Sequence, residues 1–446
     1  MDQLVRTCTL GGISMARKST RQALVLLCLI AMLAVGTVGV GTAAAATNGT
    51  IKNEGPCDKK LSEVKVGSII PGSNPTLDLQ DQADALITSA KVFNKKYNGV
   101  AGHCIAVDWC DPKVDPNAAA DCARKIADSD AVATLNDTTP NGGDAVIEIL
   151  KNAGVPRVDV SPGSPELKDP NSYAIGAGGA GTTFMMVPPL TRAGVKKIWM
   201  IAVDNPQIAA LGGIMGTMAK AYGAEIIGIS KVPAGTTDFQ QFVLAAQDGG
   251  ADGVIMPLGN NEAVQVMQAA QQLGSKLKFS SSLGTFGAKD IKDLGAVGKQ
   301  MYFNAEIPPA TASTKTWPVL KNMTADIASD GSKNNQRDKL KTSPMRSWLA
   351  LWHLKTIMEN SADPSTITRQ SVTEAMNTAT GVDSFGLMPP WTPNQPSNIL
   401  GGLFSRVSNP WYYNVKWNGK QFVIDKKLLN VGEELEGNKD YPQPTA

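Results

Sequence analysis

The chain has 446 residues, of which 42% are hydrophobic and 18% charged, with 43 glycines and 27 prolines. This composition excludes a disordered chain and allows two large domains or about three smaller ones. The formal charge of +2 comes from the N-terminal segment, which carries an excess of basic residues. Beyond that segment the chain is close to neutral, which argues against a nucleic acid or an anionic membrane surface as partner.

The N-terminal segment has the three parts of a secretory signal peptide. Basic residues between positions 17 and 21 precede an apolar run at 23–35, and small residues follow up to Ala46. We expect residues 1–46 to be a signal peptide that is cleaved after Ala46. The alternative is an uncleaved membrane anchor, because the apolar stretch approaches the ~18 residues that span a bilayer. A start at Met15 would give a shorter signal peptide.

Four cysteines lie beyond this segment, at Cys57, Cys104, Cys110 and Cys122. An even number in an exported chain indicates two disulfides. Of the three possible pairings we favour Cys110–Cys122, which closes a short loop, with Cys57–Cys104, which ties the N-terminal segment to a neighbouring strand. A metal site is the alternative, but the cysteine spacings lack the C-x-x-C pairs of such sites and the chain has only 2 histidines.

The residues after the cysteine-bearing lead alternate short β-branched runs with helical patterns, and this alternation occurs twice. In the first set we expect strands at 64–70, 104–107, 131–135 and 155–160, with helices at 79–93, 116–126 and 144–153. In the second set we expect strands at 197–203, 224–232, 253–258, 277–280 and 301–304, with helices at 208–222, 238–247 and 261–273.

Such alternation predicts parallel sheets covered by helices on both faces. The glycine-rich segment 175–181 between the two sets predicts a crossing from one lobe to the other. Near the C-terminus we expect helices at 347–360 and 366–379, then a hairpin formed by 411–415 and 421–424 with Asn-Gly at the turn. A separate third domain is the alternative, but these segments hold too few strands for a core of their own. The predicted fold class is therefore α/β, with two doubly wound parallel-sheet lobes.

Motifs of enzymes are missing from the chain. His103 and His353 are the only histidines, and the sequence contains no G-x-S-x-G, H-E-x-x-H or G-x-x-x-x-G-K-[ST] pattern. The run at 176–181 resembles a dinucleotide loop only weakly, because it does not join a strong first strand to its helix. We expect no catalytic residue, no metal and no cofactor.

Small polar residues follow most of the predicted strands. These loops lie at 73–74, 136–139, 161–164, 204–205, 259–261 and 281–284. Any one of them is more often a helix cap than a ligand contact. Ligands of open α/β sheets bind outside the carboxyl ends of the strands, so six such loops at the sheet edges predict a ligand cleft between the lobes.

The ordered motifs resemble those of the type I periplasmic substrate-binding proteins of ABC importers, in the Leu/Ile/Val-binding-protein-like branch. The motifs are VGSIIPGSNP at 66–75, DPNAAADCARKI at 115–126, VPRVDVSPGSPEL at 155–167, GTTDFQQFVLAAQDGGADGVIM at 235–256 and WYYNVKWNGKQFVI at 411–424. This resemblance implies two lobes joined by three crossovers. It places lobe one at 58–177 plus 308–396 and lobe two at 178–307 plus 397–446.

The resemblance also implies that hydroxyls and backbone N–H groups of lobe one hold a ligand carboxylate. In lobe two this sequence departs from the family pattern. Ile208 stands where an aromatic is expected, Leu283 where a carboxylate receives the ligand ammonium, and an intermediate-loop aromatic falls near Asn260. Asp204 or Asp137 could replace that carboxylate. The candidate ligand contacts are Ser73, Asn74, Asn136, Thr138, Thr139, Ser161, Gly163, Ser164, Asp204, Asn260 and Leu283.

We therefore expect an exported solute-binding protein that captures an amino acid or a related polar or amphipathic solute in the cleft. It would act as a monomer and deliver the solute to the membrane permease of an ABC transporter. One alternative is a ligand-sensing ectodomain for a signalling partner. Another is a secreted hydrolase, which lacks an evident pair of nucleophile and base.

Overall fold

The computed structural model describes residues 55–444, except 75–76, 162–164 and positions 205, 234, 332, 334, 400 and 403. The side chains of residues 206–211, 260 and 285 are also outside the description. The expected signal peptide and its cleavage site at Ala46 lie outside the described residues. No helix in the described part of the chain is long and apolar enough to cross a membrane.

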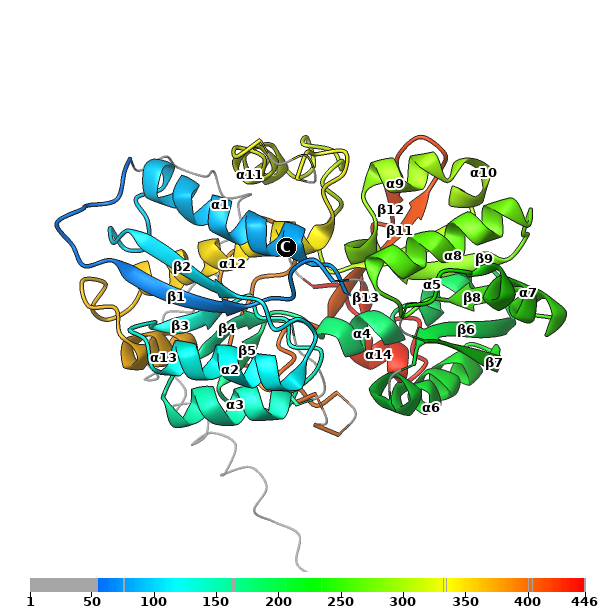
Figure 1. Cartoon of the computed structure of the whole chain (residues 1–446), viewed down its shortest axis with the longest axis horizontal. Helices are drawn as coiled ribbons and strands as arrows, with labels where there is room; N and C mark the ends of the chain where they lie inside the picture. The colour runs from blue at the N-terminus through cyan, green and yellow to red at the C-terminus, as the bar shows by residue number, and fades with distance from the viewer. Residues whose placement is uncertain are drawn as a thin grey trace, which may run out of the picture. The chain divides into compact units, whose positions relative to one another are not determined.

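Two β-sheets organise the described chain, and helices cover both faces of each (Figure 1). The first sheet is parallel and has the order β2-β1-β3-β4-β5. Its strands are β1 (Val64–Ile69), β2 (Ile105–Cys110), β3 (Ala133–Leu135), β4 (Arg157–Val160) and β5 (Ser172–Ala174). Its helices are α1 (Gln80–Lys96), α2 (Pro116–Ala127), α3 (Gly143–Asn152), α11 (Val319–Ile327), α12 (Thr342–Glu359) and α13 (Arg369–Thr378).

The second sheet has the order β12-β11-β10-β9-β8-β6-β7, and β13 also pairs with β11. Its strands are β6 (Lys197–Val203), β7 (Glu225–Val232), β8 (Gly253–Ile255), β9 (Lys278–Ser282), β10 (Met301–Ala305), β11 (Trp411–Trp417), β12 (Phe422–Ile424) and β13 (Leu429–Asn430). Its helices are α4 (Gly178–Phe184), α5 (Val187–Arg192), α6 (Pro206–Ala221), α7 (Gln240–Asp248), α8 (Asn260–Gln272), the 3₁₀ turn η1 (Leu283–Thr285), α9 (Ala288–Asp293), α10 (Gly295–Gly298) and α14 (Val431–Leu435).

Each sheet has an apolar cluster on both of its faces, which is the physical basis of the doubly wound fold. The first sheet packs against α1, α11, α12 and α13 on one face and against α2 and α3 on the other. The second packs against α7, α8 and α9 on one face and against α4, α5, α6 and α14 on the other. Within the described residues the chain passes between the sheets after β5, after β10 and before β11, which confirms the three crossovers.

The predicted strands are all present, and the C-terminal hairpin joins the second sheet through antiparallel pairing of β11 with β10. Gly419 at its turn has φ +98°, a conformation that favours glycine. One expectation needs correction. The glycine-rich segment is a crossing only at 175–177, because helix α4 begins at Gly178 and packs its small residues against the second sheet.

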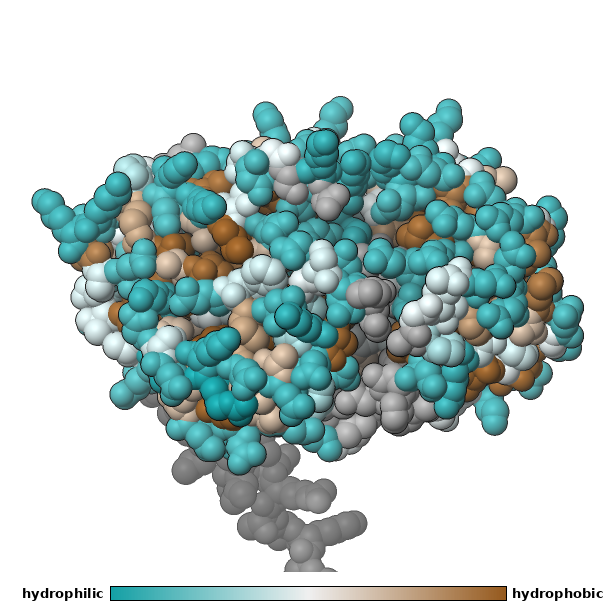
Figure 2. Space-filling model, viewed as in Figure 1, coloured by the Kyte–Doolittle hydropathy of each residue, from teal (hydrophilic) through white to brown (hydrophobic). Residues whose placement is uncertain are grey.

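The surface in Figure 2 is largely hydrophilic, with hydrophobic residues in small groups. The exposed large hydrophobic side chains of the described residues are Leu61, Ile229, Leu244 and Val423. They come from separate parts of the chain, so this face of the molecule offers no extended apolar patch.

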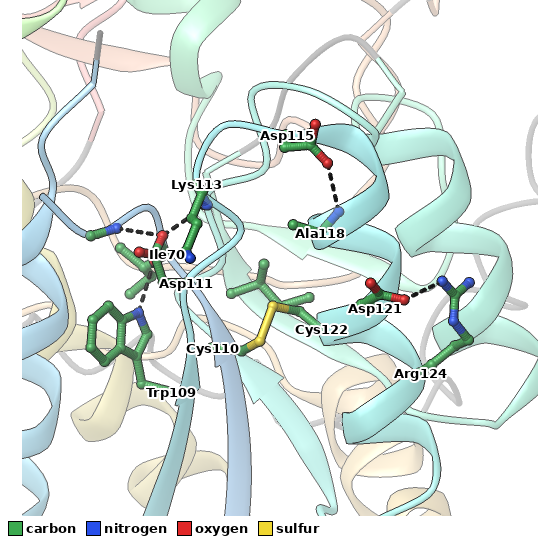
Figure 3. Close-up of a disulfide and its surroundings, with 12 residues drawn as sticks. Ile70, Trp109, Cys110, Asp111, Lys113, Asp115, Ala118, Asp121, Cys122 and Arg124 are labelled. Atoms are coloured by element: carbon green, nitrogen blue, oxygen red, sulfur yellow. Dashed lines mark hydrogen bonds and ion pairs between the residues drawn. A yellow bond between two sulfur atoms is a disulfide. The ribbon is translucent and has the colours of Figure 1, made fainter. Parts of the chain in front are cut away.

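Two disulfides are present, with the pairing that the sequence analysis favours. Cys57 pairs with Cys104, their Cα atoms 5.2 Å apart, and Cys110 pairs with Cys122, their Cα atoms 5.6 Å apart. Figure 3 shows the second bond, which fastens the end of β2 to α2. The edge strand of the first sheet is thereby tied to the helix that packs against the sheet.

The loop after β1 is held against the end of β2 by side chains that Figure 3 labels. An Asp111 carboxylate oxygen accepts hydrogen bonds from the backbone N–H groups of Gly72 at 2.9 Å and Lys113 at 2.8 Å. The Trp109 indole donates to the Ile70 carbonyl at 2.8 Å. These bonds set the direction in which the chain leaves β1, towards the first of the predicted ligand loops.

Candidate ligand-binding site

A cavity of about 280 Å³ lies between the two lobes, and both lobes line it. We call it the inner cavity. Lobe one contributes Leu77, Leu79, Thr138, Thr139, Pro140 and Ser161, and the start of α12 contributes Thr342, Ser343 and Arg346. Lobe two and its connections contribute Gly178, Gly179, Thr182, Leu258, Gly259, Ser282, Gly284, Asn304 and Glu306.

The lining follows from the direction of the strands. Residues that line the inner cavity come directly after β3, β4 and β8, and at or just after the ends of β9 and β10, so they lie at carboxyl ends of parallel strands. The loops after β3 and β4 run side by side, because Thr138 and Ser161 form an isolated parallel bridge. The sheet edges therefore meet at the cavity as the sequence predicts.

A wider polar groove of about 750 Å³ adjoins this cavity. We call it the outer groove. The two spaces are lined by neighbouring residues of the same segments. Asp78 lines the outer groove, whereas Leu77 and Leu79 on either side of it line the inner cavity. In the same way, Lys341 lines the outer groove and Thr342 lines the inner cavity. Lys341 forms an ion pair of 3.0 Å with the buried Asp81. Burial raises the pKa of the Asp81 carboxyl, and the Lys341 charge opposes that rise.

Four of the predicted ligand residues line one of these two spaces. Thr138, Thr139 and Ser161 line the inner cavity, and the exposed Ser73 lines the outer groove. Three others cannot be located, because Gly163, Ser164 and the Asn260 side chain are outside the described residues. The same holds for the side chain of Ile208.

Asn74, Asn136, Asp204 and Leu283 do not line the inner cavity or the outer groove. Asn74 donates to the Lys113 carbonyl at 3.3 Å. The buried Asn136 donates to the Ser347 hydroxyl at 2.7 Å. Asp204 is 54% exposed and pairs with a lysine on β7, and Leu283 is 1% exposed in the apolar core of lobe two. Their placement supports structural roles for Asn136 and Leu283.

A buried charge cluster lies behind the loop after β3. Arg157 is fully buried and lies 3.1 Å from both Asp137 and Glu166. Burial works against its charge, but the two carboxylates outweigh burial and raise the pKa of Arg157. Asp137 is thus committed to Arg157. Thr139 donates its hydroxyl to Glu166 at 2.6 Å, so this side chain holds the loop in place.

The Thr138 hydroxyl, unlike that of Thr139, is placed to contact a ligand. Its oxygen accepts a hydrogen bond from the Gln82 side chain at 3.3 Å, so its proton can still be donated to a ligand. Thr342 and Ser343 stand in the first turn of α12, an 18-residue helix whose N-terminal N–H groups and dipole favour a negative charge. Hydroxyl donors and this helix end suit a carboxylate on the ligand.

Glu306 and Arg346 also line the inner cavity and were not among the residues expected from the sequence. An Arg346 nitrogen donates to Glu306 at 2.9 Å, and another donates to Asp159 at 2.8 Å. The Tyr412 hydroxyl donates to the other Glu306 oxygen at 3.2 Å. Glu306 directly follows β10, and the predicted ligand loops follow their strands in the same way. Its position after a predicted strand could therefore have identified it as a candidate. Nothing local in the sequence marks Arg346, a buried residue within a helix.

Asp159 and Arg346 stay charged within this network. Burial alone would raise the pKa of Asp159, but the Arg346 charge and the neighbouring His353 hold it below its ordinary value. For Arg346, burial is outweighed by the charges of Glu306 and Asp159, which raise its pKa. Asp159 has φ +50°, a backbone conformation that Asp and Asn tolerate better than most residues.

Neither histidine lies in the lining of the inner cavity. A ring nitrogen of His103 lies 2.8 Å from the Ser62 carbonyl, and one of His353 lies 3.1 Å from the Ser384 hydroxyl. No group of three or more His, Cys, Asp or Glu that could hold a metal ion occurs in the part of the chain that the structure describes.

Two doubly wound lobes with a polar cavity at their facing strand ends are the architecture of a class of proteins that bind small solutes between their lobes. The model of the periplasmic binding protein family matches residues 63–400, and the chain belongs to this family. The family and the fold are those of substrate-binding proteins and not of enzymes, and proteins of this family are exported.

Curated relatives agree with this assignment. The chain is 27% identical over 248 residues to Leu/Ile/Val-binding protein homolog 6 of Brucella suis biovar 1, a match that covers 53% of this chain and 61% of the relative. The homologue of the same name from Brucella melitensis biotype 1 is also 27% identical, over 249 residues. The match thus spans about three-fifths of the length of these relatives.

Solved structures share the fold. A fatty acid ABC transporter substrate-binding protein from Thermomonospora curvata has a TM-score of 0.68 at 16% identity, with 89% of this chain and 98% of that chain covered. An R. palustris solute-binding protein in complex with 4-hydroxybenzoate gives 0.67 at 16% identity, covering 84% and 98%. A branched-chain amino acid ABC transporter protein from Thermus thermophilus with bound valine gives 0.67 at 13% identity, covering 84% and 99%.

Proposed function

We propose that this protein captures a small solute in the inner cavity and delivers it to the membrane permease of an ABC transporter. The observation that carries the proposal is the shared lining of the cavity, in which both lobes supply polar groups. A solute held by both lobes favours their closure, because contacts to the second lobe form only when the lobes approach. The match to Leu/Ile/Val-binding protein homologues supports an amino acid or a related polar or amphipathic solute.

The ligand carboxylate is held by Thr138, Ser161 and the first turn of α12 in this proposal. Thr139 positions the loop through Glu166, and Ser73 contacts only ligands that extend into the outer groove. Gly163, Ser164 and Asn260 remain proposed contacts from the family pattern.

We also propose that the mature protein begins after Ala46, acts as a monomer outside the cytoplasm, and has the lobe boundaries inferred from the family pattern. The two disulfides support an oxidising compartment. The small number of exposed large hydrophobic side chains among the described residues supports the monomer.

The test is a thermal-shift screen of residues 47–446 against a metabolite panel, followed by calorimetry on each hit. A solute at 100 times its Kd should stabilise the protein by about 2.7 kcal/mol. The solute should be recovered chemically unchanged after prolonged incubation. Conversion of a hit to product would contradict the proposal and support a secreted hydrolase.

A further inference from the structure

An α-amino solute in the inner cavity needs a carboxylate close by, because an unpaired buried ammonium is costly. Leu283 stands where the family pattern has that carboxylate and is buried in the core of lobe two. Asp204 lies outside the lining and Asp137 is paired with buried Arg157. Neither of the two aspartates that the sequence offered as replacements is therefore placed to receive the ammonium.

Among the described residues that line the inner cavity, Glu306 is the one with an acidic side chain. The internal positions and side chains outside the description contain neither Asp nor Glu. Glu306 follows β10, the strand that pairs directly with β9, and Leu283 follows β9. Compared with the family pattern, the carboxylate thus follows the neighbouring strand of the same sheet.

The charge balance around Glu306 leaves room for a cation. Glu306 and Asp159 both bond to Arg346, so two carboxylates share one guanidinium. His353 lies 3.7 Å from Asp159, the other carboxylate of this network.

The Glu306 carboxylate can accept further hydrogen bonds, and its position is fixed by its neighbours. Its oxygens accept one hydrogen bond each, from Arg346 and Tyr412, whereas a carboxylate has about four acceptor positions. A Cβ on Gly176 would lie 2.4 Å from a Glu306 oxygen, so the first crossover packs closely against this carboxylate. Such preorganisation reduces the entropy lost when a ligand binds.

We infer that Glu306 receives a protonated amine of the ligand, so the solute carries both an ammonium and a carboxylate. This inference rests on the proposed function and adds the chemical class of the ligand. The amine contacts Glu306 at the connection after β10, while the carboxylate contacts the hydroxyls of lobe one and the start of α12. Glu306 lies in the second crossover and packs against Gly176 of the first crossover, and it accepts a hydrogen bond from Tyr412 at the start of β11. The ammonium therefore binds next to two of the three connections between the lobes.

The first experiment uses the wild-type protein and ligands that differ in one charge. The common α-amino acids are titrated by calorimetry, and each that binds is compared with its deamino acid and its decarboxylated amine. For leucine these are 4-methylpentanoate and 3-methylbutylamine. We expect at least one amino acid to bind, with its deamino acid weaker by about tenfold or more.

The second experiment compares Glu306→Gln with Glu374→Gln, which makes the same change on the exposed face of α13, away from both cavities. Glu306→Gln should weaken amino-acid binding by about tenfold or more and change binding of the deamino acid by less than about threefold. Glu374→Gln should change neither. Circular dichroism and melting curves of the ligand-free variants verify folding. If Glu306→Gln fails to fold, the comparison of ligands on the wild-type protein still tests the inference.

The results separate this inference from the proposed function. Equal or tighter binding of the deamino acid, or binding only of solutes without an amine, would overturn the role of Glu306 and leave solute capture intact. Equal losses for the amino acid and its deamino acid in Glu306→Gln would also overturn it. If no solute of the wider metabolite panel binds, both proposals fail.

Discussion

Arg346 and Glu306 form an ion pair of 2.9 Å at the inner cavity, although 40 residues separate them in the chain. Arg346 belongs to the first turns of α12 in lobe one, and Glu306 belongs to the connection that follows β10 of lobe two. The pair joins the lobes at the cavity that both line. A second Arg346 bond, to Asp159 at 2.8 Å, anchors the guanidinium to the first sheet.

The Asp159 carboxylate should make stability depend on pH in a defined direction. Its pKa is lowered in the folded protein, so the unfolded chain takes up the proton more readily. The resulting stabilisation is complete well above the ordinary Asp pKa of about 3.9 and is lost as the pH falls through the lower folded pKa.

We therefore expect Asp159→Asn to lower the free energy of unfolding by about 2 kcal/mol or more at pH 7. The difference from wild type should shrink as the pH falls below about 4. Asn tolerates the positive φ of this position, so backbone strain does not explain the loss. Urea unfolding between pH 7 and pH 3 measures both effects. A difference that stays constant with pH would contradict the prediction.

Thr138 and Thr139 should separate binding from stability. Thr138→Ala is expected to weaken ligand binding by about tenfold while leaving the melting temperature of the ligand-free protein nearly unchanged. Thr139→Ala removes the hydroxyl that bonds to Glu166 at 2.6 Å and should cost about 1–3 kcal/mol of stability. Calorimetry and urea unfolding provide the two readouts. Thr139→Ser keeps the hydroxyl and should recover most of the loss.

Arg369 should be an important structural residue outside the binding site. Its guanidinium donates to the carbonyls of Ala127 at 3.1 Å, Ser129 at 2.6 Å, Ala131 at 2.9 Å and Ala153 at 2.9 Å. The Ala127, Ser129 and Ala153 carbonyls lie at or just beyond the ends of α2 and α3, where the helix ladder supplies no partner, and the Ala131 carbonyl lies just before β3.

Arg369→Ala should therefore lower the free energy of unfolding by about 2–4 kcal/mol, measured with urea. Arg369→Lys should recover little, because one ammonium cannot reproduce a guanidinium that reaches four carbonyls. As the control, Arg124→Gln removes an exposed side chain paired with Asp121 and should have no measurable effect. Full recovery in Arg369→Lys would show that charge, and not the set of hydrogen bonds, is what matters.

The two disulfides should contribute unequally. They join residues 47 and 12 positions apart, and a longer closed loop restricts the unfolded chain more. Replacing Cys57 and Cys104 by serine should cost about 4 kcal/mol, and replacing Cys110 and Cys122 about 3 kcal/mol. Denaturant unfolding of the two double variants tests this order. The reverse order would indicate that native contacts around Cys110 and Cys122, and not chain entropy, dominate.

Much of the fold could be predicted because the signals are local. The β-branched runs and helical patterns located the main strands and helices, and Asn-Gly at 418–419 located the hairpin. Strand β5 was missed, because its three residues carry no usable alternation. Helix α4 was missed, because glycine is a poor helix former and burial of its small side chains overrides that propensity.

The binding site could be predicted in part. Thr138, Thr139 and Ser161 follow their strands and line the inner cavity, as expected for loops at carboxyl ends. The sequence could not tell that Thr139 and Asp137 are committed to a buried cluster, because their partners Glu166 and Arg157 are distant in the chain. It also could not tell that Asp204 faces solvent.

The amino-acid sequence by itself determined the α/β class, the two sets of alternating elements and the cysteines that pair. These properties depend on periodicity, turn residues and composition, which act over a few residues. Only the tertiary structure decided which polar groups meet at and behind the inner cavity. Asp159, Glu306 and Arg346 come from three distant segments, and their charges interact strongly because folding brings them together away from water.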